Sequence, residues 1–185
     1  LTDTGSTSVG ESLYQFTHRT FLEYFAAEYL NRTTRSVDEL LDILLPRIAA
    51  GQWQVVAELA VQLYARKVED GADEVIRSLL DRATSLPAEQ TAQVAQFAAH
   101  ALEYLVLMPS SVDRVVATTL DALLNDGRTD TPSPWARSRF VRRHWAPLHS
   151  LCNASRENIN GCQRALSSYF SKRLVDSPEP VLADL

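Results

Sequence analysis

Apolar residues recur every three or four positions along most of the chain, which is the spacing that places them on one face of an α-helix. The pattern is strongest after residue 36, where one face collects Val37, Leu40, Leu41, Leu44, Leu45 and Ile48. Comparable spacing predicts helices at about 17–31, 36–46, 53–64, 71–83, 87–108, 111–125, 133–147 and 155–174. Strand signals are scarce, and residues 12–16 are the one short candidate. The pattern therefore predicts an all-α chain with at most a short strand near the N-terminus.

Several residues have the chemistry of helix ends. Ser36 and Glu39 have the spacing of a capping box, and Pro46 should bend or end the helix that they start. Pro87 suits a first helical position, and Thr17 is a candidate N-cap for the helix at 17–31. These signals place the helix boundaries independently of the apolar spacing.

The helix at 17–31 is unusually rich in aromatic residues. Its spacing predicts a buried face, made of Leu22, Phe25, Ala26, Tyr29 and Leu30. Aromatic side chains at this density near a helix start usually anchor a core, which we expect of Phe16, Phe21, Tyr24 and Phe25.

Successive helix pairs begin near Ser36, Gly71 and Ser111, a period similar to that of HEAT-type repeats. No residue pattern recurs between the pairs. Two architectures therefore stay open, an antiparallel helical bundle and a short HEAT-like helical array.

The composition is that of a soluble globular protein, with 185 residues, of which 45% are hydrophobic and 22% are charged. The apolar runs fall short of the ~20 residues that a membrane span needs, so we expect no membrane partner.

The chain opens with LTDTGSTSVG, which lacks an initiator Met and a signal peptide and indicates a piece of a longer protein. Its two cysteines make no disulfide framework, and we expect a cytoplasmic location.

Charge is distributed unevenly along the chain. Residues 1–134 carry ten Lys and Arg against nineteen Asp and Glu, whereas residues 135–173 carry eight against one. Between Trp135 and Trp145 the basic side chains are Arg137, Arg139, Arg142 and Arg143. Arginine mixed with tryptophan can bind phosphates and stack on bases, so nucleic acid is one candidate partner.

An amphipathic helix docked on the acidic part of the chain explains the same basic segment. Four arginines at these spacings cannot share one helical face, and this favours the docked helix over nucleic acid. Its buried side would consist of Phe140, Trp145 and Leu148.

The sequence predicts neither a metal site nor a catalytic one. His144, His149, Cys152 and Cys162 have the ligand types for zinc but not the paired spacing of a zinc finger. No Gly-Lys pair occurs, so the phosphate-binding G-x-x-x-x-G-K-[ST] loop is absent, and no nucleophile has a recognisable adjacent base. We therefore expect no enzymatic activity from this chain.

Residues 14–30 read YQFTHRTFLEYFAAEYL. This segment resembles F-x-H-x-[ST]-F-x-E-[YF]-[FL]-A-A-x-x-L, found at the end of the winged-helix domain in NACHT-family NTPases of the STAND class, and it matches every fixed position. The close match covers about a tenth of the chain, and a Trp-Gln-x-Val-x-x-x-Leu stretch at Trp53 extends it more weakly. The resemblance implies that residues 1–31 end a winged-helix domain, that 32–127 form a helical domain and that 128–185 form basic helices with an acidic tail.

The resemblance also implies a function. NACHT proteins are switches that ADP holds closed and that oligomerise after ligand sensing and nucleotide exchange. In such proteins the histidine of the motif, which matches His18 here, contacts the ADP phosphate. The chain would then be a non-catalytic sensor and autoinhibitory region in signal transduction or antiviral defence. Its partners would be its own upstream NACHT domain and an unidentified protein ligand. ADP, ATP and Mg would bind the intact protein, and no cofactor is expected in this chain.

Two alternatives stay open at this point. His18 could instead cap its helix or pack under Tyr14. The whole chain could be a helical-repeat scaffold that binds a protein or nucleic acid without a nucleotide switch. Exposure of His18 at the rim of its helix favours the switch, whereas burial with a backbone partner favours the scaffold.

Overall fold

The computed structural model describes residues 2–6, 12–15, 18–126 and 146–176. Within these ranges the all-α prediction is confirmed, with a small hairpin at the N-terminal end. A further helical segment spans residues 146–152. The labelled helices are α1 (Arg19–Thr33), α2 (Val37–Ala49), α3 (Gln54–Lys67), α4 (Gly71–Ala83), α5 (Ala88–Ala101), α6 (Pro109–Asp126) and α8 (Ile159–Asp176).

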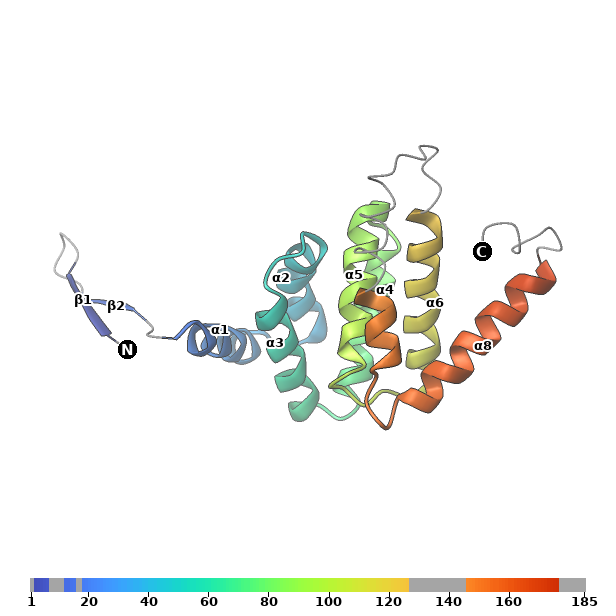
Figure 1. Ribbon diagram of the computed structural model, residues 1–185. Helices are drawn as coiled ribbons and strands as arrows, with labels where there is room; N and C mark the ends of the chain where they lie inside the picture. The colour runs from blue at the N-terminus through green and yellow to red at the C-terminus, as the bar shows by residue number, and fades with distance from the viewer. Residues whose placement is uncertain (1, 7–11, 16–17, 127–145, 177–185) are drawn as a thin grey trace.

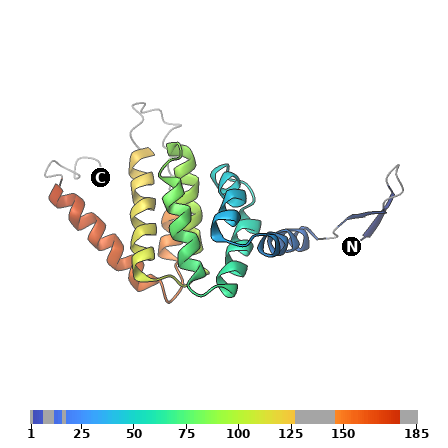
Figure 2. The ribbon, with the colours of Figure 1, turned by 180° about the vertical axis from the view of Figure 1, so that it is seen from behind.

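The helices form a row that runs from α1 at one end to α8 at the other (Figure 1). Along the row, α3 contacts both α1 and α4, while α6 contacts both α5 and α8. Helix α2 packs on α4 and α5 and so closes one side of the row. The same order is seen from behind (Figure 2). Among the described helices the arrangement is therefore that of a short, elongated array.

Helix α2 follows the apolar pattern closely. Leu40, Leu41 and Leu44 are completely buried, and Ile48 is nearly so. The capping box is also present, because the Glu39 backbone N–H donates to Ser36 Oγ at 3.2 Å. The Glu39 carboxylate in turn accepts from the Arg35 N–H at 2.8 Å. Local chemistry and tertiary burial therefore agree in this helix.

Pro46 does not end α2, so of the two predicted effects, bending or ending the helix, the second is wrong. The helix continues to Ala49, and the carbonyls around the proline find partners in the turn that follows. Ala50 N–H donates to Pro46 O at 3.2 Å and Gln52 N–H donates to Arg47 O at 2.7 Å. A proline this close to the helix end removes a single backbone hydrogen bond, which the turn tolerates.

The turn between α2 and α3 has an unusual backbone. Gly51 and Trp53 both have positive φ, 66° and 55°, in the left-handed region that is costly for a bulky residue. The guanidinium of Arg47 lies 5.0 Å from the centre of the Trp53 ring, a cation–π contact that holds the turn. Trp53 is 43% exposed, so it lies at the surface of the turn and not in the core.

A buried asparagine joins the chain after residue 146 to the middle of the row. Asn158 is 1% exposed and donates through Nδ2 to the carbonyls of Leu102 and Leu105. Its Oδ1 accepts from the Leu107 N–H at 3.2 Å, and the Ser155 N–H donates to Leu102 O at 2.8 Å. One side chain therefore satisfies three backbone groups in the irregular segment between α5 and α6.

The N-terminal strand has a partner that the sequence pattern did not predict. Strand β2 (Ser12–Gln15) pairs antiparallel with β1 (Thr2–Ser6), with an irregular register between Asp3 and Gly5. Strand β1 reads TDTGS and has no apolar residue, so the alternation that reveals a strand is missing there. The hairpin lies apart from the row of helices (Figure 1).

Several helix starts also differ from the prediction, among them that of α6, which begins at Pro109 and not at 111. His18, not Thr17, is the N-cap residue of α1, and Thr17 lies outside the described residues. Pro87 is the N-cap of α5 and not its first helical residue, so α5 begins at Ala88, one residue later than predicted. Helix α8 begins at Ile159 and not near 155, because Ser155 and Asn158 bond to the segment after α5. In the described part of the chain, no helix has the length and apolar character of a membrane span.

Candidate functional site

His18 lies at the exposed N-terminal end of α1. Its backbone is extended, with φ −124° and ψ 131°, and its side chain makes no capping hydrogen bond. The imidazole lies beside the Phe21 ring, with 6.1 Å between ring centres and a tilt of 57°. His18 therefore occupies the N-cap position without a side-chain capping bond, and its ring stands at the rim of α1, accessible to another group.

Most of the aromatic surface of α1 is exposed. The exposed fractions are 56% for Phe21, 51% for Leu22, 42% for Tyr24, 51% for Phe25 and 66% for Tyr29. The predicted burial of Leu22, Phe25 and Tyr29, and the predicted core role of Phe21 and Tyr24, are thus wrong in this structure. We refer to these five side chains as the α1 aromatic face.

The buried residues of α1 all lie in its C-terminal half. Ala27, Leu30 and Asn31 are buried, and Asn31 Nδ2 donates to Ala60 O of α3 at 2.9 Å. Lys67 Nζ donates to Asn31 O at 3.2 Å and ties the same end of α1 to the end of α3. The N-terminal end of α1 lies on the side of the hairpin, away from the rest of the array (Figure 1).

Charge near His18 is partly neutralised. Arg19 Nε donates to Glu23 Oε1 at 2.8 Å, the pair that their four-residue spacing allows. Arg19 is 87% exposed, so this pair contributes only ~0.2–0.5 kcal/mol to helix stability. The N-terminus of α1 itself carries a partial positive charge of about +0.5, which favours a nearby anion.

Most of the predicted basic helix falls outside the described part of the chain. Arg137, Arg139, Arg142 and Arg143 lie outside the described residues, as do Phe140 and Trp145. Leu148 is described, and it is 38% exposed, so its predicted place on a buried helix face is wrong. The buried residues of the 146–152 helix are Pro147, Ser150 and Leu151.

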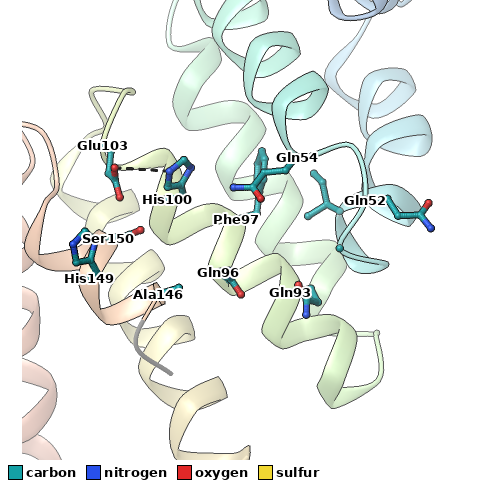
Figure 3. Close-up of a pocket in the computed structure, with 12 residues that line it drawn as sticks. Gln52, Gln54, Gln93, Gln96, Phe97, His100, Glu103, Ala146, His149 and Ser150 are labelled. Carbon is teal, nitrogen blue, oxygen red and sulfur yellow. Dashed lines mark ion pairs between the residues drawn. The ribbon is translucent and has the colours of Figure 1, made fainter. Parts of the chain in front are cut away.

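A cleft on the array was not predicted from the sequence. It has a volume of about 470 Å³ and lies where the α2–α3 turn, α5 and the 146–152 helix meet (Figure 3). Its walls combine amides, two imidazoles, a carboxylate and a hydroxyl with an apolar floor. The lining residues are Ile48, Gly51, Gln52, Gln54, Gln93, Gln96, Phe97, His100, Glu103, Ala146, His149 and Ser150.

His100 forms the polar centre of this cleft. Its Nδ1 lies 3.0 Å from Glu58 Oε1 of α3, and its Nε2 lies 3.8 Å from Glu103 Oε2. At 3.0 Å the first pair has the separation of an ion pair. The two atoms nevertheless do not have the angles of a hydrogen bond. Both Nδ1 and Oε1 are buried, and neither has a hydrogen-bond partner in the described residues. The polar centre is therefore incompletely satisfied.

Tyr104 packs behind His100, with 5.7 Å between ring centres in an edge-to-face arrangement. Its hydroxyl is buried and makes no hydrogen bond within the described structure. Burial raises the pKa of Tyr104 well above its usual range, and the nearby Glu58 and Glu103 carboxylates raise it further. The hydroxyl therefore stays protonated and remains a potential donor.

The sequence did not predict the cleft, because its lining residues come from three separate stretches of the chain. In addition, a glutamine in a helical sequence is typical of a solvent-exposed position. Within the described ranges, no group of three or more His, Cys, Asp or Glu could hold a metal ion. The chain was compared with protein-family models, curated proteins and solved structures, and none of them matches it.

Proposed function

We propose that the chain is the C-terminal sensor and autoinhibitory region of a nucleotide-switched NACHT protein. In the intact protein His18 would donate to a phosphate oxygen of ADP bound in an upstream domain. The supporting observation is the placement of the described part of the motif, residues 18–30. Its histidine stands exposed at the rim of α1, beside the α1 aromatic face, whose five side chains are 42–66% exposed.

The α1 aromatic face supports the proposed partner. Five large apolar side chains gathered on one helix exceed the scattered apolar exposure that is ordinary for a protein surface. In the proposal, this face packs into the remainder of the winged-helix domain, with which the motif is associated. The exposed aromatics would then serve as the core contact that their density predicts, made with residues beyond this chain.

The electrostatics of the α1 N-terminus suit a phosphate. An imidazole can donate to a phosphate oxygen, and its protonated form donates a stronger, charge-assisted bond. The helix dipole adds a favourable field at the same end of α1. Bound ADP would therefore favour the closed arrangement, and its loss would release α1 from the nucleotide domain.

The test is ADP retention by the intact protein after purification, with wild type compared with His18→Ala. We expect the variant to lose bound ADP and to oligomerise without a stimulus. His149→Ala is a matched control, because it removes another exposed imidazole that lies in the cleft and far along the chain. Unchanged ADP retention in His18→Ala would remove His18 from the mechanism.

A second candidate function is a helical scaffold without a nucleotide switch. The row-like packing of α1 to α8 favours it, because such arrays present extended surfaces to partners. The ADP experiment separates the two candidates: a scaffold would carry no nucleotide in either variant.

A further inference from the structure

We propose that the cleft between the α2–α3 turn, α5 and the 146–152 helix binds a small organic cation, namely a protonated amine carried on an apolar group. This inference does not depend on the nucleotide switch. It is carried by the charge, the unsatisfied polar atoms and the shape of the cleft.

The charge of the cleft favours a cationic ligand. Glu103 lines the cleft, and Glu58 lies behind His100, with 3.0 Å between Glu58 Oε1 and His100 Nδ1. Among the described lining residues none is Lys or Arg. Whether His100 is neutral or protonated, the two carboxylates leave this wall with a net negative charge. An ammonium group is therefore attracted, and a carboxylate or phosphate is repelled.

The polar wall also lacks partners. Within the described residues, Glu58 Oε1 and His100 Nδ1 are buried without hydrogen bonds, and so is the Tyr104 hydroxyl behind them. A buried carboxylate without full hydrogen bonding is costly. Glu103 is 30% exposed and can contact a ligand directly, whereas Glu58 would act on it through the electrostatic field. A cation seated beside Glu103 would thus relieve an unfavourable negative potential.

The remaining lining fits the apolar part of such a ligand. Phe97 and Ile48 are nearly buried and form an apolar floor. Figure 3 shows Gln93 and Gln96 on successive turns of α5, on the same side as His100. Their amides both donate and accept, so they suit polar substituents of either kind. The cleft volume of about 470 Å³ lies within the range typical of small-molecule sites.

The experiment is a titration of the ¹⁵N-labelled chain at pH 7 with three probes of similar size: benzylamine, benzyl alcohol and sodium benzoate. We expect benzylamine, which is protonated, to shift the Gly51 amide and the Gln93 and Gln96 side-chain amides. Its affinity should exceed that of benzyl alcohol by about tenfold, which corresponds to ~1.4 kcal/mol. Benzoate should bind more weakly than either.

Glu103→Gln tests the assignment of the carboxylate. It keeps the shape of the side chain and should reduce benzylamine binding to the level of benzyl alcohol, with the folded spectrum retained. Glu157→Gln is the control, because Glu157 is exposed and lies outside the cleft, and it removes the same formal charge. The proposal is overturned if benzylamine binds no better than benzyl alcohol, or if Glu103→Gln and Glu157→Gln have equal effects.

Discussion

At the scale of single residues, Asn158 is the clearest case of a side chain that replaces secondary structure. The segment between α5 and α6 contains backbone groups that no helix can satisfy. Asn158 satisfies three of them from a position more than fifty residues away in the sequence. Its two donors and its acceptor are all used, which no other residue type of this size would reproduce.

Asn158→Ala should therefore destabilise the fold. Removing the amide leaves the carbonyls of Leu102 and Leu105 and the Leu107 N–H without this partner, at a cost of about 2–4 kcal/mol in the free energy of unfolding. Urea denaturation followed by circular dichroism measures the change. The nearby exposed Asn160→Ala is the control and should stay within ~0.5 kcal/mol of wild type. Equal stability of both variants would show that the Asn158 bonds are replaced by water.

At the scale of elements, α2 shows which helices a sequence can specify. Its capping box and apolar stripe are local, and both are realised. For α1 the spacing also predicts a buried face, but burial depends on what packs against it, and the residues of α1 that are buried all lie in its C-terminal half. Spacing predicts that a face is apolar; it does not predict whether the folded chain supplies a partner for that face.

The cap of α2 gives a prediction at this scale. Ser36→Ala removes the acceptor of the Glu39 N–H and should lower the free energy of unfolding by about 1 kcal/mol. Ser36→Asp keeps an acceptor at the same place and should restore most of the loss. Thermal melts of the three proteins provide the comparison, and an Asp variant as unstable as the Ala variant would argue against capping as the cause.

The difference between local and long-range interactions explains which features could be predicted from the sequence. The all-α class, the buried stripe of α2 and the capping box were predictable because they depend on neighbouring residues. Strand β1 was missed because TDTGS has no apolar alternation, and Asn158 because its partners lie far away in the sequence. The cleft was missed for a related reason: Gln52, Gln93 and His149 come together only in the fold.

At the scale of the whole molecule, the α1 aromatic face and the body of the array make separate contributions. Most of the core lies in α2 to α6, whereas Phe21 and Tyr29 are more than half exposed. Changes on this face should therefore affect association with other surfaces more than the stability of the chain.

The double variant Phe21→Ser, Tyr29→Ser tests that separation. We expect its free energy of unfolding to stay within about 1 kcal/mol of wild type, because little buried area is lost. Its binding of a hydrophobic fluorescent dye should fall clearly. A large loss of stability with unchanged dye binding would mean that the α1 aromatic face is part of the core of the isolated chain.

The arrangement of the helices in a row also affects where local unfolding begins. A helix inside the row, such as α4, is held on several sides by α2, α3, α5 and α6, whereas α1 is held mainly by α3. Local unfolding should therefore begin at the α1 end, so that amide hydrogens there exchange with solvent sooner than those of α4. A domain that docks on α1 would slow exchange at that end without slowing it in α4. Hydrogen exchange would then distinguish two parts of one protein: the middle of the row, where exchange is slow in any case, and the α1 end, where exchange slows only on binding.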